Sequence, residues 1–134
     1  MIRVVIDTNV LVSALLKPAS LPGTILALVH SGRIQLCISE QIFAEYEDVL
    51  HRPHLKRDPA IVAQTLLALR ELGLWVTPNE CGQACLDPSD NIFIECAEAA
   101  GVDYLVTGNK RHFPDCWKRT NVLGSRQLIE ILAK

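Results

Sequence analysis

The sequence predicts an α/β fold of three layers, in which helices cover both faces of a central, mostly parallel sheet of four to five strands. Short β-branched runs alternate with longer segments of helical period, and this alternation is typical of parallel sheets. We find no internal repeat, low-complexity segment or interdomain linker. Because 134 residues, 49% of them hydrophobic, suffice for one hydrophobic core and not two, we expect a single domain over residues 1–134.

Five segments have the composition of strands. The first, residues 2–6, is a β-branched apolar run that ends at Asp7, which indicates a strand buried on both faces. The others are predicted over residues 34–38, 74–77, 104–107 and 120–123. Functional groups of open α/β sheets gather at the carboxyl ends of the strands, so the residues after the first and fourth strands are the first candidates for a site.

Helices are predicted from their period and from their start and stop signals. The first begins at Val10 and ends before Pro18, and residues 17–22 are predicted to form a loop. The later helices are expected over residues 24–30, 40–51, 59–72, 88–100 and 125–132. Four short polar residues are expected to cap helices, two of them followed by proline: Ser39, Asp58, Asp87 and Ser125.

Asp7 is the first candidate for chemistry. At the exit of a buried strand a carboxylate is partly desolvated, which is costly unless the group is paired, hydrogen-bonded or bound to a metal. Aspartate also often caps the helix that follows it. The local sequence leaves both roles open. Thr8 and Asn9 offer short polar side chains that could hold the carboxylate in place.

Two further acids lie on the helix predicted over residues 40–51. Glu45 and Glu47 lie on opposite edges of its apolar stripe, whereas Asp48 faces away. Periodicity does not choose between Glu45 and Glu47, and each is also compatible with a solvated flank.

Asp87 and Asp90 open a later helix. For Asp87 the structural role of a cap is preferred, and Asp90 in the first turn also suits the helix dipole. Asp90 gains a site role only when the other acids are considered with it. Hard divalent cations such as Mg²⁺ prefer oxygen ligands, so these carboxylates could hold one if the fold brings them together.

The charge balance does not by itself indicate a nucleic-acid partner, because the net charge is −2. An acidic site with a local basic rim would still be compatible with phosphate binding. The alternative is that the basic residues are ordinary solvated charges. The candidates for such a rim are Arg52, Lys56, Arg57, Lys110, Arg111, Lys118 and Arg119.

Four motifs in order together resemble the PIN-domain family. They are Ile6-Asp7-Thr8-Asn9-Val10-Leu11, then Ser39 with Glu45 and Val49-Leu50-His51-Arg52-Pro53, then Asp87-Pro88-Ser89-Asp90-Asn91, then Tyr104-Leu105-Val106-Thr107-Gly108-Asn109. Each motif is weak alone, but the set spans nearly the whole chain. The group that the chain resembles most is the VapC-like toxin ribonucleases of toxin–antitoxin pairs.

The resemblance implies a ribonuclease dependent on Mg²⁺ or Mn²⁺. It places the metal-binding and catalytic acids at Asp7, Glu45 and Asp90. The family often has a fourth acid where this chain has Asn109, a neutral residue that can still offer a carbonyl oxygen. The residues that would support the acids or the phosphate are Thr8, Asn9, Asp87, Thr107 and Asn109. Those that could contact RNA are Arg52, Lys110, Arg111 and His112.

The resemblance also implies partners and a compartment. We expect RNA as the substrate, a cognate antitoxin protein and a homodimer, for which the mean hydropathy of +0.22 leaves room. No apolar run approaches the roughly 20 residues of a membrane span, and the first residues have no signal-peptide layout. We therefore expect a cytoplasmic protein with no membrane segment, in which most of the five scattered cysteines are reduced.

Other functions fit the sequence less completely. A phosphatase of the haloacid dehalogenase type also has an aspartate after its first strand, but it needs a second two residues later, where this chain has Asn9. No P-loop or glycine fingerprint is present. Zinc could be bound by Cys81, Cys85, His112 and Cys116, although no second tight Cys-x₂-Cys pair supports this. The non-enzymatic alternative is a PIN fold that has lost activity and binds RNA or protein.

Overall fold

β1 (Arg3–Ile6) lies at the centre of a six-stranded sheet in the computed structural model, which describes residues 1–79 and 88–134. It pairs in parallel with β2 (Gln35–Ile38) on one side and with β4 (Tyr104–Val106) on the other. The strand order is β3-β2-β1-β4-β6-β5, with β3 at Leu74–Trp75, β5 at Cys116–Trp117 and β6 at Thr120–Leu123.

The predicted sheet is confirmed as mostly parallel, with one strand more than the four to five expected. The additional strand is β5, which pairs antiparallel with β6 across a turn at Lys118 and Arg119. Lys118 adopts a left-handed conformation there, with φ of 55°. A strand of two residues is too short to show a period of its own, so the sequence pattern did not reveal it.

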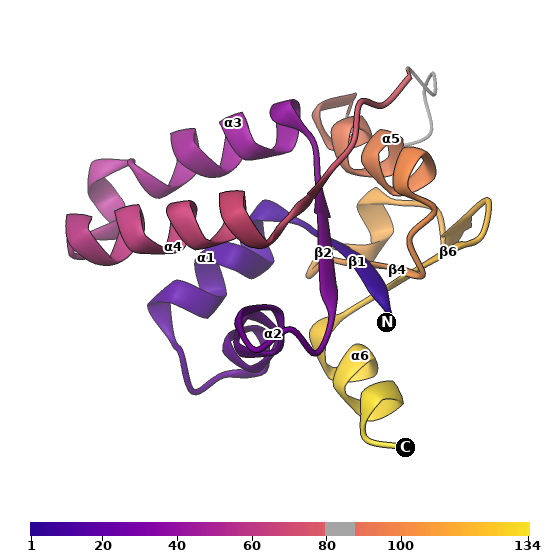
Figure 1. Ribbon diagram of the computed structural model, residues 1–134, viewed down its shortest axis with the longest axis horizontal. Coiled ribbons are helices and arrows are strands. Elements are labelled where there is room, and N and C mark those ends of the chain that lie inside the picture. Colours follow the sequence, from indigo (N-terminus) through magenta and orange to yellow (C-terminus); the bar gives the residue numbers. More distant parts are fainter. Residues whose placement is uncertain (80–87) are drawn as a thin grey trace.

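Helices cover both faces of the sheet, as the three-layer prediction requires. Figure 1 shows α3 and α5 on one side of the strands and α2 and α6 on the other. The six helices of the described residues are α1 (Thr8–Leu16), α2 (Leu21–His30), α3 (Glu40–Leu50), α4 (Pro59–Leu72), α5 (Asn91–Ala100) and α6 (Ser125–Leu132). Three 3₁₀ turns accompany them: η1 (Pro53–Leu55), η2 (Pro88–Asp90) and η3 (Lys110–His112).

Three helix starts and one helix cap differ from the prediction. α1 begins at Thr8 and not at Val10, and α5 begins at Asn91, after the turn η2. The loop predicted over residues 17–22 is too long, because α2 begins at Leu21: the Ser20 side chain accepts a hydrogen bond from the Gly23 backbone amide at 3.3 Å. The cap of α6 is Gly124 and not Ser125, which is already helical. The Gln127 side chain takes the place of a capping hydroxyl and accepts from the Gly124 amide at 3.0 Å.

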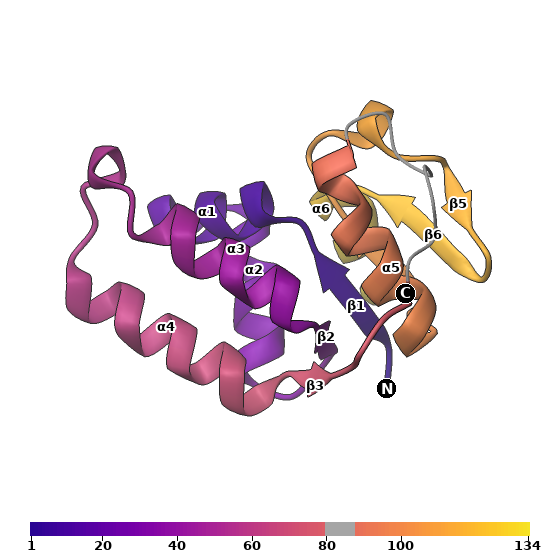
Figure 2. The same ribbon diagram turned by 90° about the horizontal axis from the view of Figure 1, so that it is seen from above.

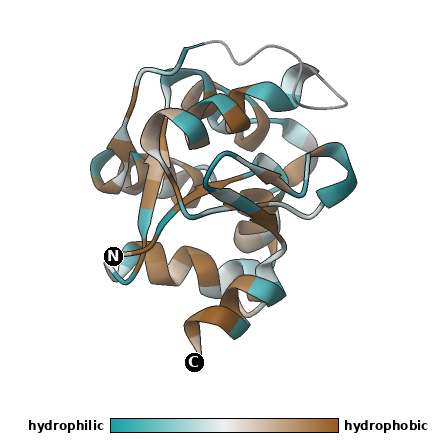
Figure 3. Ribbon diagram, turned by 90° about the vertical axis from the view of Figure 1, so that its right-hand side faces the viewer, coloured by the Kyte–Doolittle hydropathy of each residue, from teal (hydrophilic) through white to brown (hydrophobic). Residues whose placement is uncertain are grey.

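The core lies between the strands and the inner faces of the helices. Val4 and Val5, whose side chains point to opposite faces, are both fully buried, which confirms that β1 is covered on both sides. The strands are hydrophobic along most of their length (Figure 3). Cys37 and Cys96 are buried free thiols, and burial raises their pKa values to about 11 and about 12. Both are core cysteines, as predicted.

Within the described ranges, no single helix is long and apolar enough to cross a membrane. Only α1 and α2 taken together reach the required length and composition, and they are bent by 98° relative to each other.

Candidate active site

The candidate site lies at the carboxyl ends of β1 and β4. Because Ile6 pairs with Val106 in a parallel register, the next residues of the two strands, Asp7 and Thr107, lie side by side. The Asp7 backbone amide donates to the Val106 carbonyl at 2.9 Å. The Thr107 hydroxyl donates to Asp7 Oδ2 at 2.7 Å. Two segments that are 100 residues apart in sequence therefore meet at one carboxylate.

The Asp7 carboxylate is held in a buried place. The residue is 5% exposed, and this burial raises the pKa of its carboxyl group. The Thr107 hydroxyl, the backbone amides of Thr8 and Asn9, and the charge of His112 act in the opposite direction. Asp7 occupies the N-cap position of α1, but its side chain accepts no capping hydrogen bond. Its hydrogen-bonding partner is Thr107.

Glu45 is connected to the start of α1. The Thr8 hydroxyl donates to Glu45 Oε2. On the next residue of α3, the buried Tyr46 hydroxyl donates to the carbonyl of Ile6, the last residue of β1. These two contacts fasten α3 to the segment that carries Asp7, and they place Glu45 at this end of the sheet. The role of Tyr46 was not predicted, because its position in the apolar stripe of α3 only indicated a core residue.

The choice between the two glutamates follows from these contacts. Glu45 is partly buried, whereas Glu47 is exposed and lines a surface hollow with Arg70 and Trp75. Asp48 faces away, as predicted, and its Oδ2 lies 3.1 Å from an Arg52 guanidinium nitrogen. Of the three acids on α3, Glu45 is the one that lies next to the Asp7 segment.

Asp90 precedes α5 and lies beside a histidine. It ends the turn η2, and its Oδ2 lies 3.6 Å from His112 Nδ1. His112, one of the residues expected to contact RNA, ends the turn η3. The charge of His112 also lowers the pKa of Asp7, so this histidine interacts electrostatically with both aspartates. Asp87 lies outside the described residues.

The backbone of Asn109 orients the Thr107 hydroxyl group. Its backbone amide donates to Thr107 Oγ1 at 3.0 Å, so this oxygen accepts from Asn109 and uses its own hydrogen for Asp7. Asn109 does not form a left-handed turn after Gly108, since its φ is −123°.

Two pairs of the basic residues predicted for a rim lie at opposite ends of the strands. Lys118 and Arg119 precede β6 and therefore lie at the amino ends of the strands, where they pair with Glu98 at 3.6 Å and Asp103 at 2.9 Å. We remove both from the predicted rim. At the carboxyl edge, Lys110 and Arg111 are exposed on η3.

The donors at this edge suit a hard cation. They are carboxylate, hydroxyl and amide oxygens, and no Lys, Arg or His of the described chain forms an ion pair with Asp7 or Glu45. Among residues 1–79 and 88–134, no three His, Cys, Asp or Glu side chains are grouped closely enough to enclose a metal ion. This donor set fits Mg²⁺ or Mn²⁺ that keeps several waters, a state common for Mg²⁺. Cys81 and Cys85 of the alternative zinc set lie outside these ranges.

The sequence comparison decides the family. A family model described as "PIN domain" matches residues 3–111, from the start of β1 into η3. The chain belongs to the PIN domain family. The matched span of this PIN domain contains Asp7, Glu45, Asp90 and Thr107.

Two known proteins are similar to this PIN domain. An uncharacterized protein of Methanocaldococcus jannaschii is 34% identical over 113 residues, which cover 81% of this chain and 72% of the relative. A crystal structure of VapBC2 from Rickettsia felis, bound to a DNA fragment from their promoter, contains a chain with the same fold. The TM-score is 0.60 at 14% identity, and the match covers 92% of this PIN domain and 98% of that chain.

Proposed function

We propose that this PIN domain is a Mg²⁺- or Mn²⁺-dependent ribonuclease that hydrolyses RNA phosphodiester bonds in the cytoplasm with Asp7, Glu45 and Asp90. The observation that carries the proposal is the state of Asp7: a buried carboxylate, held by a hydroxyl, with which no Lys, Arg or His of the described residues forms an ion pair. Burial of an unbalanced charge is costly, and a bound cation removes that cost. Membership of a family of metal-dependent nucleases supports the same assignment.

Each acid has a residue that positions it. Thr107 holds Asp7, Thr8 holds Glu45, and His112 lies beside Asp90. These contacts restrict the rotamers of the carboxylates. When bound there, a divalent cation orients a water, lowers its pKa and stabilises the leaving oxygen of a phosphodiester. Asn109 contributes no charge, so the site has one anionic group fewer than sites with a fourth acid.

Cleavage and metal binding test the proposal separately. Purified protein should cleave single-stranded RNA with Mg²⁺ or Mn²⁺ and not with EDTA. Calorimetric titration with Mn²⁺ should show binding that weakens sharply in Asp7→Asn and Asp90→Asn. Undiminished Mn²⁺ binding in both variants would refute the assignment of the acids.

The two glutamates of α3 offer a matched control. Glu45→Gln and Glu47→Gln make the same chemical change two residues apart on one helix. We expect only Glu45→Gln to reduce cleavage, because only Glu45 contacts the Asp7 segment through Thr8. An equal loss in both variants would mean that net charge, and not the position of Glu45, matters.

We further propose that the protein is the toxin of a toxin–antitoxin pair and forms a homodimer. The likeness in fold to a chain of the Rickettsia felis VapBC2 structure supports this. The antitoxin would supply a segment that blocks the acidic site, with a basic side chain facing Asp7. Expression should arrest growth and co-expression of the neighbouring small reading frame should restore it, while light scattering that shows only monomer at micromolar concentration would contradict the dimer.

The alternative is a PIN fold that binds RNA or protein without cutting. The neutral Asn109 favours it, because this residue stands where the family often has an acid. Tight RNA binding by the wild-type protein with no cleavage at any Mg²⁺ or Mn²⁺ concentration would support this alternative over the nuclease.

A further inference from the structure

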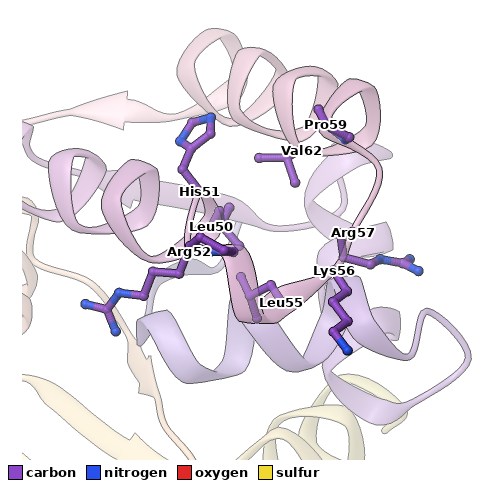
Figure 4. Close-up of a pocket in the computed structure, with 9 residues that line it drawn as sticks. Leu50, His51, Arg52, Leu55, Lys56, Arg57, Pro59 and Val62 are labelled. Carbon is purple, nitrogen blue, oxygen red and sulfur yellow. The ribbon is translucent and has the colours of Figure 1, made fainter.

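The loop between α3 and α4 forms a basic pocket at some distance from the acids. The pocket has a volume of about 180 Å³ and lies over Leu50, Leu55 and Val62. Its basic lining residues are Arg52, Lys56 and Arg57, together with His51. In Figure 4 the charged ends of Arg52, Lys56 and Arg57 point outward in three different directions from this apolar floor. Such divergent charges suit an extended polyanion better than one small ion.

Two of these cations have no acidic partner. Among the described residues, Arg52 is paired with Asp48, but neither Lys56 nor Arg57 forms an ion pair. The Nε atom of Arg57 is also buried without a hydrogen-bond acceptor. A buried donor without an acceptor costs about 1–3 kcal/mol. Arg57 therefore has hydrogen-bonding capacity that the protein itself does not use.

The backbone of the loop is also unusual at Lys56. Its φ is 52°, a left-handed conformation that glycine and asparagine adopt more readily than lysine. The loop thus holds two adjacent unpaired cations, Lys56 and Arg57, in a backbone conformation that lysine itself does not favour.

The position of the loop relates it to the acids. Glu45 and His51 are six residues apart on α3 and its cap, which is about 9 Å along a helix axis. Figure 2 shows η1 on the same side of the molecule as α1 and the start of α5, at the far end of α3 from the strands. Lys110 and Arg111 lie on η3, next to the Asp90–His112 contact. Two pairs of adjacent basic residues are therefore connected to the acids by short segments: Lys56–Arg57 follow the helix that carries Glu45, and Lys110–Arg111 precede the His112 that contacts Asp90.

We propose that Lys56 and Arg57 bind backbone phosphate groups of RNA at one end of a path that crosses the acidic site and reaches Lys110 and Arg111 at the other end. The inference rests on the proposed function, since it names the course of the same substrate. It assigns the Lys56–Arg57 pair to substrate positioning, outside the group of acids. Positioning contacts to phosphates strengthen binding without reading the base sequence.

The experiment measures RNA binding as a function of salt. In an Asp7→Asn background, which prevents cleavage, fluorescence anisotropy gives the affinity for a single-stranded RNA at several KCl concentrations. The double variant Lys56→Gln/Arg57→Gln should lower the slope of log affinity against log salt by about 0.7 for each lost phosphate contact, about 1.4 in all. Lys56→Gln alone changes only an exposed side chain, and it keeps the test informative if the double variant does not fold.

The control removes the same charges from the other edge of the sheet. Lys118 matches Lys56 in residue type and in its left-handed backbone, and Arg119 follows it as Arg57 follows Lys56. Lys118→Gln/Arg119→Gln should leave the slope unchanged. An equal fall in both double variants would show a general charge effect and overturn the proposal.

The remaining outcomes separate the two proposals. Cleavage by the wild type, combined with an unchanged slope in Lys56→Gln/Arg57→Gln, would overturn the RNA path alone. Absence of both cleavage and RNA binding would overturn the path and the nuclease together. Saturable binding of inorganic phosphate that the double variant abolishes, with no change in the RNA slope, would assign the loop to a free anion and also overturn the path.

Discussion

Two aspartates at opposite ends of neighbouring strands have opposite surroundings. Asp103, just before β4, accepts from the Arg3 backbone amide at 2.9 Å and from the Arg119 guanidinium at 2.9 Å, and these contacts lower the pKa of its carboxyl group. Asp7, just after β1, has a raised pKa because it is buried, and among the described residues it forms no ion pair. Asp103 thus has a guanidinium partner, whereas Asp7 is influenced by the charge of His112 without pairing with it. On the proposed function, a divalent cation from solution would balance the Asp7 carboxylate.

The largest expected effect is a difference in RNA cleavage between variants of these two aspartates. Asp7→Asn should reduce RNA cleavage by more than about 100-fold, the upper end of the loss caused by removing a partner of a metal ligand. Asp103→Asn should retain nearly full cleavage in the same assay, because its contacts lie at the other edge of the sheet. Comparable losses in the two variants would remove the distinction drawn here.

Two buried threonines allow the same comparison between the two edges of the sheet, for residues that hold a partner by a hydroxyl hydrogen bond. Thr107 and Thr120 are both fully buried, and each donates through its hydroxyl, to Asp7 at 2.7 Å and to the Val102 carbonyl at 2.8 Å. Replacement by valine should lower the free energy of unfolding by about 1–3 kcal/mol at either site, since each leaves a buried polar partner unsatisfied. Only Thr107→Val should also reduce cleavage, by roughly 10–100-fold. Full activity of folded Thr107→Val would show that Asp7 does not depend on this hydroxyl.

The pH dependence of stability should have opposite signs for the two aspartates. With EDTA present, the raised pKa means that the protonated Asp7 carboxyl group contributes to the free energy of unfolding. This contribution is fully present below pH 3.8, the ordinary pKa, and is lost as the pH rises through the raised pKa. The lowered pKa means that the ionised Asp103 carboxylate contributes to the free energy of unfolding. This contribution is present above pH 3.8 and is lost as the pH falls through the lowered pKa. At pH 7, Asp7→Asn should therefore stabilise and Asp103→Asn destabilise the protein, the latter by about 1 kcal/mol.

Urea unfolding from pH 3 to pH 7 measures both effects. Both differences from the wild type should shrink toward acid pH, where the carboxyl groups become protonated in the folded and unfolded states alike. Destabilisation by Asp7→Asn at pH 7 would contradict the account of a carboxylate left unbalanced.

The smallest expected effect comes from adding a charge next to Thr107. Asn109→Asp places a fourth acid at the carboxyl edge and should tighten Mn²⁺ binding and raise cleavage at limiting Mg²⁺ a few-fold. Asp7→Asn in the same background should abolish the gain. Asn121→Asp on β6, exposed near the amino edge, is the control and should change neither. If Asn109→Asp leaves both quantities unaltered, Asn109 lies beyond the reach of the ion.

The sequence predicted the parts of this site more completely than their connections. Apolar runs and helix periods located the strands and the carboxyl edge, and Asp7 and Thr107 were both found from their positions after strands. The choice of Glu45 over Glu47 needed the Thr8 contact, because both glutamates satisfy the helical period equally. The Tyr46 contact to Ile6 joins residues 40 apart, and no local pattern reports such a pairing.

The predicted start of α2 and the predicted location of Lys118 and Arg119 were wrong for a similar physical reason, since both depend on contacts that local sequence does not show. The start of α2 depends on the Ser20 cap, a single hydrogen bond that the prolines nearby obscured. The turn that orients Lys118 and Arg119 away from the site is created by the two-residue strand β5, and its existence depends on pairing with β6. Predicting on which edge these cations lie requires the strand order, which local sequence does not contain.

The hydrogen bond between Thr107 and Asp7 also sets an order of events during synthesis. The chain is made from its N-terminus, so β1 and Asp7 exist long before β4, which pairs with β1 and carries Thr107 at its end. Contacts between segments 100 residues apart close late in folding, because the loop between them must first be ordered. A nascent chain therefore contains Asp7 early and the hydroxyl group that holds its carboxylate late. If the proposed nuclease function is correct, the growing polypeptide would not cleave RNA until most of its length has been synthesised.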